Sequence, residues 1–212
     1  MQDRGLALYH RFLSGDEGAL EELIALYQRG LLRFIDSYLR DNALSEDVLQ
    51  EVFIQIYFKR TFKERENASF KTYLYKIARN KSLNELKKRK RKKEVSLDSF
   101  QEKNKEPTAL ADGQNVASAL DSNKSSEQFF YHADFEESME KQQLTLLLKR
   151  AIDKIKEEYK EVLILRYFDD LEIEEIAKIT KKNTKQVYNL LSRGKLALKE
   201  TLLKEGYHYE KF

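Results

Sequence analysis

Residues 69–93 read SFKTYLYKIARNKSLNELKKRKRKK, and this stretch decides the fold. Its first half carries apolar side chains at steps of three and four, the spacing of one face of an α-helix. Those side chains are Phe70, Tyr73, Leu74, Ile77, Leu83 and Leu86. Ser69 is a suitable N-cap, because its hydroxyl can accept a hydrogen bond from a backbone N–H of the first turn.

The same stretch ends in seven adjacent cations, Lys87 to Lys93. They cover every face of a helix and repel one another, so they need an anionic partner or open water. Taken alone, such a run is typical of a solvated or nonspecific polyanion-binding tail. The sequence therefore predicts a helix that is anchored in a core at one end and exposed to a polyanion at the other.

Composition favours an all-α protein. The 212 residues include one proline and seven glycines, and no β-type alternating run occurs. The absence of cysteine excludes a disulfide, a thiolate metal site and a cysteine nucleophile. The sequence shows no signal-peptide pattern after Met1 and no apolar run of about 18 residues, so we expect a cytoplasmic protein without membrane insertion.

Net charge divides the chain into three parts. It is +6 over residues 1–94, −7 over residues 95–140 and +4 over residues 141–212. Two basic blocks therefore flank an acidic middle. This charge pattern favours two polyanion-binding domains that are joined by a tether. We therefore expect two small helical domains, residues 1–93 and 134–212, joined by a flexible acidic linker over residues 94–133.

The first domain should hold four helices. The apolar spacing predicts helices over residues 4–14, 16–40, from about Ser45 to 60, and from Phe70 onward, with a polar loop at 63–68. The linker has no periodicity and contains the only proline, Pro107. Its aromatic cluster Phe129–Tyr131 either docks on a domain or leads into the next helix.

The second domain ends in the pattern of a helix-turn-helix. A short helix around Ile173–Ile179 is followed by a polar turn, and then by a helix that Asn183 and Gln186 can open as a capping box. The outward side chains of that helix can contact base edges and phosphates: Thr184, Lys185, Gln186, Tyr188, Asn189, Ser192 and Arg193.

Three blocks make the chain resemble the extracytoplasmic-function (ECF) sigma factors of the main bacterial sigma family. EDVLQEVFIQIY at 46–57 is similar to region 2.2, and FKTYLYKIARNKSLNELKKRKR at 70–91 is similar to regions 2.3 and 2.4. The region 4 block, EYKEVLILRYFDDLEIEEIAKITKKNTKQVYNLLSRGKLAL, spans residues 158–198. Order and spacing of the blocks agree with the family.

The resemblance implies partners and sites. Region 2.2 would bind the β′ clamp helices of core RNA polymerase through Asp47, Gln50, Glu51 and Phe53. Regions 2.3 and 2.4 would melt the promoter −10 element and hold a flipped base through Asn67, Tyr73, Lys76, Arg79, Asn80, Lys87, Arg89 and Arg91. Region 4 would read the −35 element of promoter DNA and rest on the β flap. An anti-sigma factor is a further expected partner.

Some positions depart from the family pattern. Lys181-Lys182 occupies the turn, Tyr188-Asn189-Leu190 follows the recognition valine, and Gly194 replaces a common alanine at a cost of roughly 1 kcal/mol in helix propensity. The −35 sequence preference therefore does not follow from the resemblance.

Two rival hypotheses remain at this point. The chain could be a stand-alone helix-turn-helix regulator whose first domain only dimerises. An enzyme acting on nucleic acid is the other, but the sequence offers no catalytic motif, no cofactor motif and no small-molecule site. His10, His132 and His208 stand apart from one another, which argues against a metal site.

Overall fold

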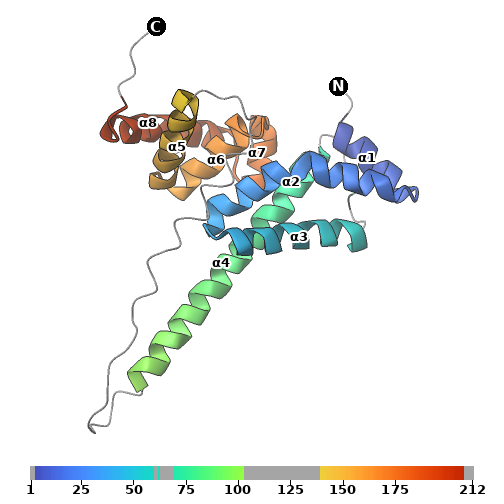
Figure 1. The fold of residues 1–212 in the computed structure, drawn as a ribbon, viewed down its shortest axis with the longest axis horizontal. Coiled ribbons are helices and arrows are strands. Elements are labelled where there is room, and N and C mark those ends of the chain that lie inside the picture. The colour runs from blue at the N-terminus through green and yellow to red at the C-terminus, as the bar shows by residue number, and fades with distance from the viewer. Residues whose placement is uncertain (1–2, 60–61, 63–68, 103–138, 208–212) are drawn as a thin grey trace.

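The computed structural model describes residues 3–59, 62, 69–102 and 139–207, and of residues 93–102 and 139–142 only the backbone. Within these ranges the chain forms eight helices and no strand (Figure 1). Their bounds are α1 Arg4–Leu13, α2 Glu17–Leu39, α3 Asn42–Lys59, α4 Phe70–Glu102, α5 Met139–Lys154, α6 Glu157–Tyr167, α7 Ile173–Thr180 and α8 Thr184–Lys204. The all-α prediction is confirmed.

Helices α1 to α4 form the first domain around a shared apolar core. Phe34 and Ile35 of α2, Val52 of α3 and Leu74 of α4 are completely buried there. The predicted cap is present, since the backbone N–H of Thr72 donates to the Ser69 hydroxyl at 3.1 Å. Helix α3 begins three residues before the predicted start, because the Asp41 carboxylate accepts from the backbone N–H of Leu44 at 3.1 Å.

Helix α4 is longer than the first domain requires. Its C-terminal half leaves the bundle and extends away from the other helices, and it continues to Glu102 (Figure 1). The first nine residues of the predicted linker, 94–102, are thus helical. The rest of the predicted linker, with its aromatic cluster, and the predicted loop at 63–68 with Asn67 lie outside the described residues.

Helices α5 to α8 form the second domain, in which α7 and α8 make the predicted helix-turn-helix. The capping box is confirmed: the N–H of Gln186 donates to Asn183 Oδ1 at 2.8 Å, and the N–H of Asn183 donates to Gln186 Oε1 at 2.9 Å. Lys181 ends α7 in the left-handed region with φ 58°, and Asp170 adopts φ 47° in the break before α7.

The two domains pack against each other. Helix α6 lies on α2, and α7 lies on α4 close to its N-terminus (Figure 1). Apolar residues of both domains belong to one continuous buried cluster. The first turn of α4 and the first helix of the helix-turn-helix are therefore direct neighbours.

Candidate nucleic-acid and polymerase interface

One face of α4 forms an exposed polar stripe along the helix. Lys76, Asn80, Asn84, Lys87 and Arg91 follow one another at steps of four, four, three and four, and all five are exposed. This spacing places their side chains on the same side of a helix. Four of the predicted −10 residues lie on this stripe, which we call the α4 stripe.

Two other predicted −10 residues, Arg79 and Arg89, lie on different faces of α4. Arg79 Nε donates to Glu161 Oε1 of the second domain at 2.5 Å, with side chains only 15% and 6% exposed. Arg89 pairs with Asp41 at 2.5 Å, and this hydrogen bond lowers the pKa of the Asp41 carboxyl. In this arrangement the Arg79 guanidinium is largely buried, whereas Arg89 keeps 43% of its side chain exposed. The DNA contacts of both arginines stay predictions.

The aromatic residues of α4 divide between core and surface. Phe70 and Tyr75 are buried, whereas Tyr73 is half-buried, its ring 5.1 Å from that of Phe62 and 6.2 Å from that of Phe70. Of the three aromatics, Tyr73 thus keeps an accessible part. The choice of Tyr73 for a base contact stays a prediction.

Helix α3 presents a second exposed stripe. Asp47, Gln50 and Glu51 lie on it, and Glu51 accepts from Lys81 Nζ at 2.7 Å. Ile54 and Phe58 continue the same stripe at helical spacing, 53% and 75% exposed. We call these five residues the α3 stripe.

The fourth predicted polymerase contact, Phe53, does not lie on the α3 stripe, and its role in polymerase binding stays a prediction. Phe53 is 8% exposed and belongs to the core, because its position turns it away from the α3 stripe. Tyr57 is 40% exposed at the end of the helix, where its ring lies 5.8 Å from that of Phe12.

All seven predicted −35 residues on α8 are exposed, while Val187 and Leu191 on the opposite face are buried. One of the seven has a structural task, since the Gln186 side chain accepts from the backbone of Asn183. The others present hydroxyl, amide, phenol and cationic groups along nearly three turns of helix. This combination can contact both phosphates and base edges in a major groove.

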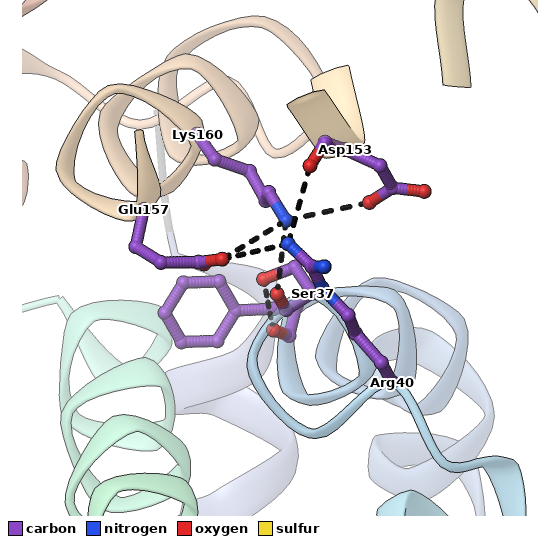
Figure 2. A network of polar contacts seen from close by, with 6 residues as sticks. Ser37, Arg40, Asp153, Glu157 and Lys160 are labelled. Carbon is purple, nitrogen blue, oxygen red and sulfur yellow. Dashed lines mark hydrogen bonds and ion pairs between the residues drawn. The ribbon is translucent and has the colours of Figure 1, made fainter. Parts of the chain in front are cut away.

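A network of polar contacts joins the two domains. Lys160 of α6, 1% exposed, donates to the backbone oxygen of Ser37 in α2 at 3.4 Å and pairs with Asp153 and Glu157 (Figure 2). Arg40 of the first domain approaches the same group, 2.8 Å from Glu157 and 3.2 Å from the backbone oxygen of Asp153 (Figure 2). The buried lysine is thus surrounded by acceptors from both domains.

Two more carboxylates cross the boundary. Arg33 of α2 donates to Asp169 at 3.0 Å, and Lys71 of α4 donates to the Asp169 backbone oxygen. Burial raises the pKa of Asp169, although Arg33 works against this shift. Glu175 accepts from Ser69 and Thr72. Burial acts to raise the pKa of Glu175, but these bonds, the backbone N–H of Glu172 and the charge of Lys71 together lower it.

The described residues hold no group of three or more His, Asp or Glu side chains arranged to bind a metal ion. Nor does any described helix combine the length and the apolar character that a bilayer span requires.

Comparison with known proteins identifies the class of the chain. Residues 23–92 match the family described as Sigma-70 region 2, and residues 145–198 match the family described as Sigma-70, region 4. Together the two matches span more than half of the chain. The chain therefore belongs to the sigma-70 family of transcription initiation factors.

Full-length relatives refine this placement. The chain is 26% identical over 191 residues to "ECF RNA polymerase sigma factor SigW" of Bacillus subtilis (strain 168), covering 89% of this chain and 91% of the relative. It is 25% identical over 201 residues, 95% of each chain, to "RNA polymerase sigma-H factor" of Pseudomonas aeruginosa (strain PAO1). The protein is an alternative sigma factor of the ECF type, and the stand-alone regulator is not supported.

Solved structures share the fold. The sigma factor RpoE from Bartonella quintana, in complex with the anti-sigma factor NepR, superposes with a TM-score of 0.58 at 19% identity, covering 87% of this chain and 96% of that one. CnrH in complex with the cytosolic domain of CnrY gives a TM-score of 0.57 at 16% identity, over 94% and 96% of the two chains.

Sequence reasoning missed two features of the site. The first is that Ile54 and Phe58 extend the α3 stripe. Their spacing from Asp47 places them on the same side of a helix, and this signal was present in the sequence. The pairing of Arg33 and Arg79 with carboxylates of the second domain had no sequence signal, because the partners lie 136 and 82 positions away.

Proposed function

We propose that the three exposed helix faces each bind a different part of the polymerase–promoter complex. The α3 stripe binds the β′ clamp helices of core RNA polymerase, the α4 stripe binds the −10 element, and the exposed face of α8 binds the −35 element. The observation that carries the proposal is the α4 stripe. On this exposed face the amide of Asn80 lies among cations, and the half-buried ring of Tyr73 precedes the stripe on the same helix.

Strand opening on such a surface needs no covalent chemistry. Bases that leave the stack can be held by an aromatic ring and by polar side chains, while cations neutralise the exposed backbone. Tyr73 and Asn80 have the chemistry for the first task, and Lys87 and Arg91 have it for the second. On this proposal the protein is a binding factor and not an enzyme.

The α3 stripe suits a coiled-coil partner. Its N-terminal half offers carboxylate and amide groups to a basic surface, and its C-terminal half offers Ile54 and Phe58. Exposed apolar residues beside a polar set are typical of the centre of a protein–protein interface. We therefore extend the polymerase site from Asp47 to Phe58 and assign Phe53 to its support.

Further partners and the domain limits follow from the same proposal. The sigma factor RpoE, which shares this fold, is in complex with the anti-sigma factor NepR, and this favours such a partner for this chain. The functional modules would be residues 1–93 and 134–212, with the acidic linker 94–133 between them. A factor that works with core polymerase on promoter DNA acts in the cytoplasm.

A selection experiment tests the proposal. Purified protein is combined with core polymerase, and promoters are selected from a random DNA library by retention of the complex. A sigma factor should enrich two short sequence blocks at a fixed spacing, and only when core enzyme is present. Enrichment of one palindromic block by the protein without polymerase would overturn the proposal.

A further inference from the structure

The carboxylate of Asp3 joins the starts of two helices that lie far apart in the sequence. Its Oδ1 accepts from the backbone N–H groups of Gly5 and Leu6 at 3.0 and 3.3 Å, and this caps α1. Its Oδ2 accepts from the backbone N–H of Phe70, the first residue of α4, at 2.9 Å. The first N–H groups of a helix have no acceptor within the helix, and the helix dipole favours a negative charge there. One side chain therefore satisfies both helix ends and ties them together.

The same corner of the first domain is closely packed. Gly5 is buried against α2, where a Cβ atom would lie only 2.0 Å from the hydroxyl oxygen of Tyr27. Glycine is thus what allows α1 to lie this close to α2. Phe70 is buried as well, and its ring stacks on that of Tyr9 of α1 at 4.7 Å. The bond from Phe70 to Asp3 therefore fixes α4 against a helix that is itself held in place.

The start of α4 also bears the aromatic group that the proposed function needs. Tyr73 lies three residues after Phe70, and its ring is 5.1 Å from that of Phe62 and 6.2 Å from that of Phe70. Phe62 in turn packs edge-on against Tyr9 of α1 at 5.9 Å. The position of Tyr73 therefore depends on how α1 and α4 are joined. An aromatic ring that is already in place binds an unstacked base more tightly, because ordering side chains on binding costs free energy.

We propose that Asp3 is a positioning residue of the −10 site. Its carboxylate fixes the first turn of α4, and it thereby keeps the ring of Tyr73 where an unpaired base of the −10 element can stack on it. Asp3 acts through Tyr73 and does not itself touch DNA. The inference rests on the proposed function, which assigns Tyr73 to a base. It adds a role in strand opening for α1, a helix to which the proposed function assigns none.

Asp3→Asn separates the two tasks of the carboxylate. The amide oxygen can still cap α1, since asparagine is a favourable N-cap residue, but the amide nitrogen cannot accept from the N–H of Phe70. Asp16→Asn is the matched control. It makes the same chemical change at the cap of α2, where Asp16 accepts from the N–H of Ala19 at 3.2 Å.

Amide hydrogen exchange of the free protein tests the contact itself. Asp3→Asn should raise the exchange rate of the Phe70 N–H about tenfold, because this group loses a charged acceptor. Asp16→Asn should leave that rate at the wild-type value. An unchanged rate in Asp3→Asn would overturn the proposal, since the carboxylate would then not hold α4.

DNA binding by the holoenzyme tests the consequence. One probe is a single-stranded oligonucleotide with the −10 block found by promoter selection, and the other is a random-sequence duplex of the same length. Asp3→Asn should raise the Kd for the oligonucleotide about fivefold, because the first turn of α4 must then be ordered on binding. The Kd for the duplex should not change, since duplex binding depends on the cations farther along α4. Asp16→Asn should change neither value.

A double variant shows whether Asp3 acts through Tyr73. Tyr73→Leu removes the aromatic ring and keeps an apolar side chain, so adding Asp3→Asn to it should weaken oligonucleotide binding no further. Independent effects of the two changes would overturn the proposal. So would equal effects of Asp3→Asn on both probes, or a lower melting temperature with no change in either Kd, because Asp3 would then serve only the fold.

Failure of the proposed function would look different. A wild-type holoenzyme that binds the −10 oligonucleotide no better than a random oligonucleotide would refute the assignment of α4 to the −10 element, and the role of Asp3 in DNA binding with it. Faster exchange of the Phe70 N–H in Asp3→Asn would still assign Asp3 to the start of α4.

Discussion

Gly194 on α8 shows how packing can reverse a propensity argument. Considered as a sequence, the glycine costs its helix roughly 1 kcal/mol relative to alanine. In the structure Gly194 is buried where α8 crosses α6, and a Cβ atom there would lie 3.2 Å from Tyr159 Cβ and 3.3 Å from Leu163 Cδ1. Glycine allows the two helices to approach this closely.

We therefore expect Gly194→Ala to give no gain in stability, because the crowding at Tyr159 offsets the propensity gain of about 1 kcal/mol. The free energy of unfolding from urea titration measures this. Ser192→Ala, at an exposed position of the same helix, is the control and should stabilise by a few tenths of a kcal/mol. A clear stabilisation by Gly194→Ala would show that the helices have room to move apart.

Tyr27 makes stability depend on alkaline pH. Burial raises its pKa above the ordinary value of 10.0, and the negative charges of Asp3 and Glu175 add to the shift. The folded state thus holds the phenol proton that the unfolded state releases first. The stability that this proton contributes is present below about pH 10 and is lost as pH rises further.

The melting temperature of the wild-type protein should accordingly fall as pH rises from about 9 to about 11, and that of Tyr27→Phe should fall less steeply. Lysines titrate in the same pH range and affect both proteins, so the effect of Tyr27 is read from the difference between the two melting-temperature curves. Parallel curves would mean that Tyr27 ionises as easily in the folded protein as in the unfolded chain.

At the scale of the helix, α4 should separate into a part that opens DNA and a part that holds it. Asn80→Ala should slow open-complex formation by the holoenzyme roughly tenfold, through the loss of about 1–2 kcal/mol of hydrogen bonding to an exposed base. Fluorescence of 2-aminopurine in the −10 element reports the opening.

Neutralising the basic end of the α4 stripe should act differently. Lys87→Gln together with Arg91→Gln should weaken binding to all DNA sequences and reduce the slope of log K against log salt by about 2. Titrations of specific and random duplexes at several salt concentrations measure this. If Asn80→Ala produced the same uniform loss, α4 would be only a basic helix.

The end of the α3 stripe gives a prediction about polymerase binding. Phe58 is exposed, so Phe58→Ala should leave the melting temperature unchanged. If polymerase buries the ring, the Kd for core enzyme should rise at least tenfold, because a buried phenylalanine contributes about 1.5–3 kcal/mol. Leu196→Ala, an exposed apolar residue on α8, is the control in a fluorescence anisotropy titration. An unchanged Kd for Phe58→Ala would remove Phe58 from the site.

For the molecule as a whole, the sequence predicts those structural features that depend on residues close together in the chain. Periodicity indicated the helices, and the chemistry of Ser69, Asn183 and Gln186 indicated their caps. The outward residues of α8 followed from the same helical spacing. Each of these features depends on residues at most a few turns apart, and so a single chain carries enough information to predict them.

The relation between the domains could not be predicted this way. Arg33 and Arg79 look like ordinary solvated cations in the sequence, and their partners become visible only when α6 and α7 lie on α2 and α4. Phe53 was assigned to polymerase by resemblance, but its side chain faces the core. Pairings between distant charges depend on the tertiary arrangement, which periodicity does not encode.

Run-off transcription tests the central claim most directly. Core RNA polymerase is incubated with this protein on a template that carries a selected two-block promoter, and on a matched template with the upstream block scrambled. The account predicts a transcript of defined length from the first template only, dependent on the added protein. Equal transcription from both templates, or none above core enzyme alone, would contradict it.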